Sequence, residues 1–432
     1  MRCDVAILGA GPAGLAAAGA AVAAGKSVIV LDLGTRPGGQ YFRHPNGKPT
    51  KELAGLLSAC RGTRMLLGRK VFLVEQGPPS TIHVVDGEPV VTDSVIIATG
   101  AHDRVVPFPG WDLPGVLTAG GAQALWKGSR VLPGKRIVVG GTGPFLLPVA
   151  AGLASAGADV VGVFEANDPR RFARFPMTLA RNPGKLLEAA GYLGTLARHR
   201  VPIRNRRAVV AAHGEGGVTA VTVARVDADW RPVPGTERLI DCDTVAIGCG
   251  FVPQIDIALA LGCASEVAAD GTVVLTVDGK QRTSVPGVYA AGEVTGIGGV
   301  RMSLAEGAIA GRVGAPGPGR SARQAEFARA LAAVYPVREG WLDWLAGDTL
   351  LCRCEEVDYD AVRAAAGLGA RDARAVKLLT RAGMGWCQGR MCAGAVACAI
   401  NVPVEPARRI LAQPIRLGDL AEPLAEPTEE SR

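Results

Sequence analysis

The sequence predicts an α/β fold in which two Rossmann-like dinucleotide-binding domains are nested and a small helical domain follows. Two glycine-rich loops, each between a buried strand and a helix, predict the nested domains. Four cysteines in two close pairs near the C-terminus predict the third domain. The expected boundaries are 1–120 and 245–312 for the outer domain, 121–244 for the inner domain, 313–347 for a linker and helix, 348–403 for the cysteine-containing domain and 404–432 for a tail.

The composition is that of a globular protein of several domains. The chain has 432 residues, which suggests about three domains. Apolar residues make up 48% and charged residues 20%. The modest net charge of +7 and the aromatic content of 5% argue against a nucleic-acid partner. The ten cysteines are not spaced like a secreted disulfide framework, so we expect a cytoplasmic protein, peripheral at the inner face of the cell membrane if it meets a membrane.

The first glycine loop has the spacing of a dinucleotide-binding unit. Gly9 allows a tight turn out of the strand, Gly11 lets the backbone approach a pyrophosphate, and Gly14 lets helix and strand pack closely. Pro12 follows at the helix N-terminus, whose free N–H groups attract phosphate. The second strand ends on Asp32, which can accept hydrogen bonds from ribose hydroxyls. This order of elements predicts a bound dinucleotide.

The second unit begins with a strand at 136–141 and ends on an acid in the same way. Gly141 and Gly143 form its loop, and Glu165 ends its second strand. Leu146 stands where the third glycine would be, so we expect the helix to be displaced from the strand. Two interpretations stay open, namely a bound nucleotide of the NAD(P) or ATP type, or a Rossmann unit with an altered pocket.

A strongly basic stretch follows the second unit. Residues 166–207 contain ten Arg or Lys and two acidic residues, a net charge of +8. Arg170 and Arg171 come soon after Glu165 and could pair with a nucleotide phosphate. The alternative for most of these side chains is a solvated or subunit-facing surface.

Three further motifs extend the pattern. Ala98-Thr99-Gly100 follows a strand, Gly250-x-x-Pro253 follows another, and Ala291-Gly292-Glu293 follows a third. With the two loops, these motifs resemble those of the flavoproteins with two dinucleotide-binding domains, over about residues 1–312. The resemblance implies that the outer domain holds FAD and that the inner domain is of the NAD(P)H-binding type.

The same resemblance implies which residues meet each cofactor. The flavin would lie near Gly39 and Gln40, and the ribityl chain near Glu293, where Asp is commoner in the family. The residues implied for FAD are Gly9, Gly11, Pro12, Gly14, Asp32, Gly39, Gln40, Thr99, Gly100, Gly292 and Glu293. Those implied for an inner nucleotide are Gly141, Gly143 and Glu165. The disulfide-reductase branch is excluded, because no Cys-x4-Cys follows Asp32 and residues 121–244 contain only Cys242.

The C-terminal cysteines have the spacing of a metal centre. Cys352-x-Cys354 and Cys387-x4-Cys392 are separated by 32 residues, and four thiolates in two pairs can surround metal. Zinc is one alternative, although its cysteine pairs are usually Cys-x2-Cys. We interpret the other six cysteines as structural: Cys3, Cys60, Cys242, Cys249, Cys263 and Cys398.

The segment around these cysteines resembles a [2Fe-2S] domain of the bacterioferritin-associated-ferredoxin type. Within it, GMGWCQGRMC at 383–392 resembles the GMGxCQGRxC run of the FAD-binding A or alpha subunits of dye-linked amino-acid dehydrogenases. That group includes subunits of opine oxidase, of proline and hydroxyproline dehydrogenases and of hydrogen cyanide synthase. Residues 98–123 and 140–153 resemble the same group. The resemblance implies a [2Fe-2S] cluster on Cys352, Cys354, Cys387 and Cys392.

The resemblance also implies a function. A partner flavoprotein of the beta type, with or without a small third subunit, would oxidise an amino acid or opine, and this chain would relay electrons to a respiratory or dye acceptor. No His or carboxylate constellation in the sequence suggests a substrate base. Lys377, Arg381 and Arg390 could offset the negative charge of the cluster. The alternatives are a self-sufficient NAD(P)H-dependent flavin reductase that passes electrons to a ferredoxin-like partner, and a non-catalytic assembly subunit.

Overall fold

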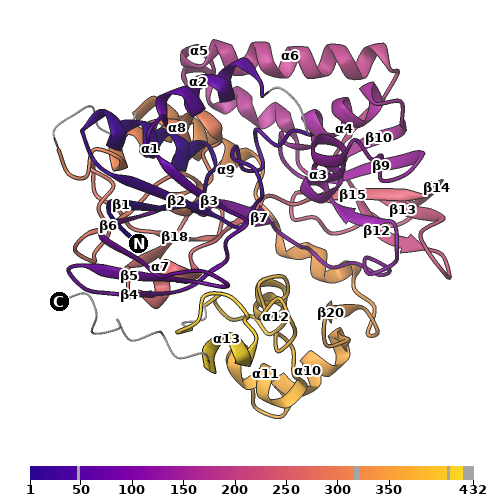
Figure 1. Ribbon diagram of the computed structural model, residues 1–432. Helices are drawn as coiled ribbons and strands as arrows, with labels where there is room; N and C mark the ends of the chain where they lie inside the picture. Colours follow the sequence, from indigo (N-terminus) through magenta and orange to yellow (C-terminus); the bar gives the residue numbers. More distant parts are fainter. Residues whose placement is uncertain (46–48, 316–321, 406–408, 422–432) are drawn as a thin grey trace.

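The computed structural model describes residues 1–45, 49–315, 322–405 and 409–421, and parts of the predicted linker and tail lie outside them (Figure 1). The described residues form two α/β domains and a smaller C-terminal domain that contacts both. The fold class expected from the sequence is therefore correct. Within these residues, no helix combines the length and the apolar character needed to cross a membrane.

The first domain is built on a seven-stranded sheet in the order β3-β2-β1-β6-β5-β4, with β19 paired to β6. β3, β2, β1, β6 and β19 pair in parallel, whereas β4 and β5 join antiparallel. Near-continuous apolar runs form the central parallel strands, as burial on both faces requires. The bounds are β1 (Arg2–Leu8), β2 (Val28–Asp32), β3 (Arg64–Leu67), β4 (Val71–Glu75), β5 (Ser80–Val84), β6 (Val90–Ile97) and β19 (Val288–Ala290).

Helices α1 (Pro12–Ala23) and α8 (Val300–Ala310) pack against each other over one face of this sheet (Figure 1). Their approach depends on small residues. A Cβ added at Gly307 would lie 2.1 Å from the carbonyl oxygen of Ala13. This contact explains why α1 is rich in alanine and has no polar face. Helix α2 (Lys51–Ala59) packs beside α1.

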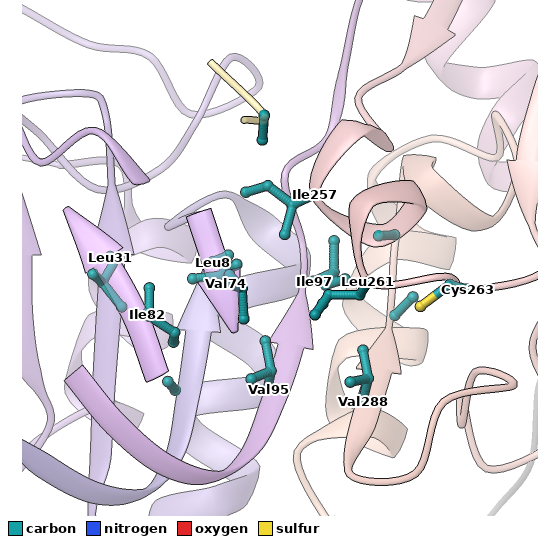
Figure 2. Close-up of a cluster of buried hydrophobic side chains, with 14 of the residues drawn as sticks. Leu8, Leu31, Val74, Ile82, Val95, Ile97, Ile257, Leu261, Cys263 and Val288 are labelled. Carbon is teal, nitrogen blue, oxygen red and sulfur yellow. The ribbon is translucent and has the colours of Figure 1, made fainter. Parts of the chain in front are cut away.

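The opposite face of the sheet carries a second apolar cluster. Figure 2 shows Leu8, Leu31 and Ile97 of the parallel strands together with Ile82 of β5 and Ile257 of α7. Because successive side chains of a strand point to opposite faces, the parallel strands supply both apolar clusters. The remaining elements of this domain are α7 (Asp256–Ala260), β17 (Ser265–Val267), β18 (Val273–Leu275) and the 3-10 helix η2 (Glu293–Thr295).

The second domain contains a parallel five-stranded sheet in the order β11-β10-β9-β15-β8. Ile137 and Val139 of β9 pack against α3, α4 and α6, whereas Val138 packs against the antiparallel sheet β12-β13-β14. The strands are β8 (Val116–Thr118), β9 (Arg136–Gly141), β10 (Asp159–Glu165), β11 (Ile203–Asn205), β12 (Arg207–His213), β13 (Ala220–Arg225), β14 (Arg238–Asp241) and β15 (Thr244–Gly248). The helices are α3 (Ala119–Ser129), α4 (Leu146–Ser155), η1 (Pro169–Arg174), α5 (Pro176–Arg181) and α6 (Pro183–Arg198).

The pairing of β8 and β15 shows that the second sheet extends beyond the predicted limits of the inner domain. β8 lies within the predicted outer range 1–120, and all but the first residue of β15 lies within 245–312, yet both strands pair in the second sheet. The inner sheet therefore extends past the predicted range 121–244 at both ends. Neither end is marked by a change in composition, which is why the sequence does not reveal it.

Two short strands connect the domains. β7 (Ala101–Asp103) and β16 (Phe251–Pro253) pair antiparallel where the chain crosses from one domain to the other. Beside them, Thr99 Oγ1 donates to the carbonyl of Gln254 at 2.5 Å, and the Gln254 N–H donates to the carbonyl of Gly100 at 2.9 Å. The Thr99-Gly100 motif is thus tied to the returning crossover.

The C-terminal domain has a small core of its own and binds to both larger domains. Trp344 stacks on Trp230 of the second domain, with ring centroids 6.0 Å apart. The Ala412 N–H donates to the Phe72 carbonyl of the first domain, so this part of the predicted tail is packed. The elements of this domain are η3 (Glu339–Trp344), β20 (Leu350–Cys352), β21 (Val357–Asp358), α10 (Tyr359–Gly367), α11 (Ala373–Thr380), α12 (Ala393–Ala399) and α13 (Leu417–Ala421). Helix α9 (Ala322–Val334) precedes the domain and packs on α5, η1 and α8 of the two larger domains.

Candidate cofactor sites

The first glycine loop is crowded at two of its glycines and open at the third. A Cβ at Gly9 would lie 2.2 Å from the Ala98 carbonyl oxygen, and one at Gly14 would lie 1.8 Å from that of Gly9. At Gly11 the nearest atom would be 4.0 Å away, and Pro12 begins α1 directly after it. Open space over Gly11 at a helix N-terminus is what the approach of a diphosphate needs.

Asp32 supports this loop from the end of β2. One carboxylate oxygen accepts the Ala10 N–H at 2.5 Å, and the other accepts the Gly34 N–H at 2.6 Å. Asp32, predicted to bind the ribose, thus also stabilises the backbone of the loop through these two hydrogen bonds. This second role is not apparent from the spacing of the motif.

Gly39 and Gln40 lie on the turn that faces the loop. A Cβ at Gly39 would lie 2.9 Å from the Cα of Gly11, and its φ of +59° favours glycine. Gln40 is exposed, and its Oε1 accepts a hydrogen bond from Arg43 at 3.0 Å. Gly39 therefore narrows the space above Gly11.

Glu293, predicted to lie at the ribityl chain, is hydrogen-bonded to the protein backbone. Glu293 Oε1 accepts the Gly299 N–H at 2.9 Å, and burial raises the pKa of Glu293 to about 7. The Gly292 N–H donates to Glu306 Oε2 at 2.9 Å. Glu306 is fully buried and also accepts from Thr295 Oγ1 at 2.8 Å. Glu306 was not predicted from the sequence, although one acid in an apolar helix is a signal of such a role.

The second glycine loop is arranged differently from the first. Glu165 is buried, and its Oε1 accepts from Thr142 Oγ1 at 2.7 Å and from the Asn167 N–H at 2.8 Å. Its Oε2 accepts the Gly143 N–H at 2.8 Å. Burial raises the pKa of Glu165 to about 7. The carboxylate predicted to bind a ribose thus accepts three hydrogen bonds from its own chain. One of them comes from the Gly143 N–H, which a dinucleotide phosphate would otherwise accept.

Helix α4 starts later in its unit than α1 does in the first, and the displacement from the strand expected from Leu146 stays a prediction. Helix α1 begins three positions after Gly9, whereas α4 begins five positions after Gly141, at Leu146 itself. Leu146 is buried in the helical face of the domain. A leucine could not occupy the position of Gly14, where even a Cβ collides with backbone. The first turn of α4 is therefore shifted along the chain.

A segment from the C-terminal part covers the same loop. Asn167 Nδ2 donates to Thr142 Oγ1 at 2.8 Å and to the Pro336 carbonyl at 2.9 Å. Burial, with a smaller contribution from nearby Glu165, raises the pKa of the adjacent Tyr335. The connection after α9 thus lies over the Glu165 end of the inner sheet. This cover leaves no signal in the sequence, because the two segments lie about 170 residues apart.

The basic stretch lines a cavity of about 330 Å³ at the carboxyl ends of β10 and β11. Its lining contains four arginines and one acid, Asp168, whose carboxylate accepts the backbone N–H of Arg170 at 3.0 Å. Burial and neighbouring arginines lower the pKa of Arg207. The lining residues are Asp168, Arg170, Ile203, Arg204, Asn205, Arg206 and Arg207. Arg171, predicted beside Arg170, is not among them.

The four C-terminal cysteines meet in two pairs that join the two sequence motifs. Cys354 Sγ lies 3.9 Å from Cys387 Sγ, and this pair faces the surface. Cys352 and Cys392 form the buried pair. A hydrogen bond from Cys392 and one from the Gly383 N–H lower the pKa of Cys352 to about 5. The same hydrogen bond raises the pKa of Cys392, so both thiols of this pair would have to lose their protons to bind metal.

The two thiol pairs can be compared with the ligand set of an iron–sulfur cluster. Two thiol pairs match the ligand number of a [2Fe-2S] cluster, in which each iron takes two protein ligands. The glycines around them are needed, since a Cβ at Gly385 would lie 2.3 Å from Cys354 Cβ.

Two of the three cations predicted near the cluster are paired with carboxylates. Arg381 Nε lies 3.0 Å from Glu355 Oε2 within the C-terminal domain. Arg390 binds Asp256 of the first domain with two nitrogens, at 3.0 and 3.2 Å. Their charges therefore do not simply offset that of a cluster. Asp256 belongs to no sequence motif, so its pairing with Arg390 could not be predicted from the sequence.

Comparison with known proteins supports the same two regions. Residues 3–311 match the pyridine nucleotide-disulphide oxidoreductase family, and residues 350–401 match the BFD-like [2Fe-2S] binding domain. The chain belongs to the pyridine nucleotide-disulphide oxidoreductase family and has a BFD-like [2Fe-2S] binding domain near its C-terminus. It is an FAD-dependent oxidoreductase with a C-terminal [2Fe-2S] domain, as the motifs predicted.

Relatives of known name extend over nearly the whole chain. The HcnB component of hydrogen cyanide synthase from Pseudomonas aeruginosa is 33% identical and covers 90% of each chain. The corresponding component of opine oxidase from Agrobacterium tumefaciens is 32% identical, over 97% of this chain and 91% of its own. These matches confirm the predicted resemblance to such subunits. The fold resembles that of L-proline dehydrogenase from P. horikoshii, with a TM-score of 0.69 at 20% identity over 98% of this chain and 80% of that one.

Proposed function

We propose that this oxidoreductase is the electron-relaying subunit of an amino-acid or opine dehydrogenase. A flavoprotein partner oxidises the substrate, and this chain passes the electrons through FAD and a [2Fe-2S] cluster to a respiratory or dye acceptor. The observation that carries the proposal is the direct bond between the cluster loop and the first domain, through Arg390 and Asp256. A cluster site fixed against the flavin domain of the same chain suits internal electron transfer. We place the complex in the cytoplasm or at the inner face of the membrane.

The proposed cofactor contacts follow from the local geometry. N–H groups at the start of α1 would donate to the FAD diphosphate over Gly11, and Asp32 keeps the loop in shape. The four thiolates would hold the cluster, with the Gly383 N–H donating to the Cys352 sulfur. When bound, FAD accepts electrons in pairs and the cluster passes them singly. The fold thus offers a two-electron site and a one-electron site.

The substrate class is inferred from the relatives. One relative is named as part of an opine oxidase, and another as part of a hydrogen cyanide synthase. Opines and amino acids share an amine carbon that loses two electrons on oxidation. We therefore propose proline, hydroxyproline, an opine or glycine as the substrate of the partner, with a small third subunit as a further component.

The second candidate function, an NAD(P)H-dependent reductase, is favoured by one observation. The cavity lined by Arg170, Arg204, Arg206 and Arg207 is suited to a phosphate group. Against it, Glu165 accepts the Gly143 N–H that a dinucleotide would need, and Pro336 covers the loop through Asn167. The relay proposal is better supported by these contacts.

One measurement separates the candidates, namely anaerobic visible absorbance of the purified chain after addition of NADH or NADPH. We expect no bleaching of the flavin and cluster bands, while dithionite reduces both. Rapid bleaching would establish the reductase function instead. If dithionite also failed to reduce them, the cofactors would be structural, and the chain would be a non-catalytic assembly component. The complex purified with its partner should then bleach with one of the proposed substrates.

A further inference from the structure

The loop between the two later cluster cysteines is bound to the first domain by one arginine. Arg390 Nη2 and Nε lie 3.0 and 3.2 Å from the two carboxylate oxygens of Asp256, a bidentate ion pair. Its Nη1 donates to the carbonyl of Cys387 at 3.1 Å. The two side chains are only 18% and 22% exposed. One guanidinium therefore connects a proposed cluster ligand with the flavin domain.

Both crossover strands meet this loop. Asp256 begins α7 two residues after Gln254, which is hydrogen-bonded to Thr99 and Gly100. On the other strand, His102 Nε2 lies 3.4 Å from the carbonyl oxygen of Arg390. The Thr99-Gly100 motif, proposed to lie at the flavin, and the cluster loop are thus bound to the same crossover segment.

A second arginine reinforces the contact from further along the chain. Arg409 Nη1 lies 3.7 Å from Asp256 Oδ1, and its Nη2 donates to the carbonyl of Gln388 in the cluster loop. Asp256 therefore pairs with two arginines that both bind the loop backbone. Removal of this carboxylate would leave both guanidinium groups without their shared partner, in a partly desolvated position.

We propose that Asp256 is a positioning residue, which fixes the cluster loop against the crossover strands through Arg390 and so sets the rate of electron transfer between flavin and cluster. The inference rests on the proposed function for the transfer itself. Each electron lost at the flavin is gained at the cluster, and no proton or group moves through Asp256.

The test uses the full chain carrying Asp256→Asn. FAD, iron and sulfide contents and the visible circular dichroism of the cluster should match those of the wild type. After photoreduction of the flavin, transfer to the cluster should be roughly tenfold slower, equivalent to about 1.4 kcal/mol. Backbone amides of residues 383–392 should exchange hydrogen faster. Arg390→Lys keeps the charge but loses the bidentate geometry, so electron transfer from flavin to cluster should also be slower than in the wild type.

Arg381→Gln is the matched control. It removes an ion pair of the same 3.0 Å length beside the cluster, but one that does not reach the first domain. Its loss changes the charge near the cluster but not the contact with the first domain, so transfer should be slowed clearly less than in Asp256→Asn. Equal slowing in this control would assign the effect to charge near the cluster and overturn the proposal.

Wild-type transfer and exchange rates in Asp256→Asn would also overturn the positioning role. If the wild-type chain itself showed no transfer between flavin and cluster, the proposed relay function would fail instead. The hydrogen-exchange comparison would then still decide whether Asp256 holds the loop.

Discussion

Single residues of the two glycine loops decide what each loop can bind. A Cβ at Gly11 would come no closer than 4.0 Å to another atom, and one at Gly143 would meet nothing within 4 Å. The loops differ instead at the Gly143 N–H, which donates to Glu165. The sequence identifies both loops and both acids, and it flags Leu146 as a departure from the pattern. It does not show that Glu165 turns back on its own loop, because that choice depends on Asn167 and on the cover by Pro336.

Gly11→Val should exclude FAD. Its side chain would fill the space above the loop, where the diphosphate would approach the backbone. We expect the purified variant to lack stoichiometric flavin absorbance while it keeps iron and sulfide. Gly55→Ala is the matched control, since a Cβ at this position in α2 meets nothing within 4 Å. A Gly11→Val chain with a full complement of FAD would contradict the proposed loop contact.

Glu165→Gln should change the pH dependence of stability. The folded pKa of Glu165 is raised from 4.5 to about 7, so the wild type binds this proton more tightly when folded. The raised pKa contributes fully to the free energy of unfolding below pH 4.5. This contribution, on the order of 3 kcal/mol, is lost as the pH rises through 7. The Tm of the wild type minus that of the variant should therefore be smaller at pH 8 than at pH 4.5. A difference that is constant or larger at pH 8 would mean that the three donors keep the carboxylate ionised.

At the scale of elements, the buried strands were the most predictable part. The expected strands at 136–141 and 159–165 coincide with β9 and β10, because apolar runs bounded by glycine and charge define them. The three-residue strand β8 was not foreseen, since so short a run carries no periodic signal. The close packing of α1 on α8 also follows from sequence only in part, through the small residues of both helices.

Gly307→Leu should weaken the contact between α1 and α8. Even a Cβ there would lie 2.1 Å from the Ala13 carbonyl oxygen, so the helices must separate. Overpacking of this kind costs about 1–3 kcal/mol, and we expect a lower Tm and weaker retention of FAD. Gly152→Ala in α4 is the contrasting variant, because a Cβ at this position meets nothing within 4 Å. The higher helix propensity of alanine should raise the free energy of unfolding by about 1 kcal/mol. A rise in Tm for Gly307→Leu would refute the packing argument.

At the scale of the whole molecule, the sequence predicts three domains but not how they meet. The C-terminal domain contacts the first domain through Arg390 and the second through Trp344, and each partner lies more than 100 residues away. Such pairs leave no local pattern, so composition and spacing cannot reveal them. The cysteine set, by contrast, was predictable because its ligands cluster in two short motifs. Only their pairing across the motifs required the structure.

Cys387→Ser tests whether the two proposed cofactor sites are occupied independently. The serine hydroxyl is a poor substitute for a thiolate ligand, so the cluster should be lost. FAD should remain, because the first domain has its own core and its glycine loop makes no contact with this cysteine. Iron, sulfide and flavin analysis of the purified chain measures both. Cys398→Ala, in the same domain but outside the four, should keep all three. Unchanged iron and sulfide in Cys387→Ser would remove this residue from the ligand set, and loss of FAD would show that the cluster domain supports the flavin site.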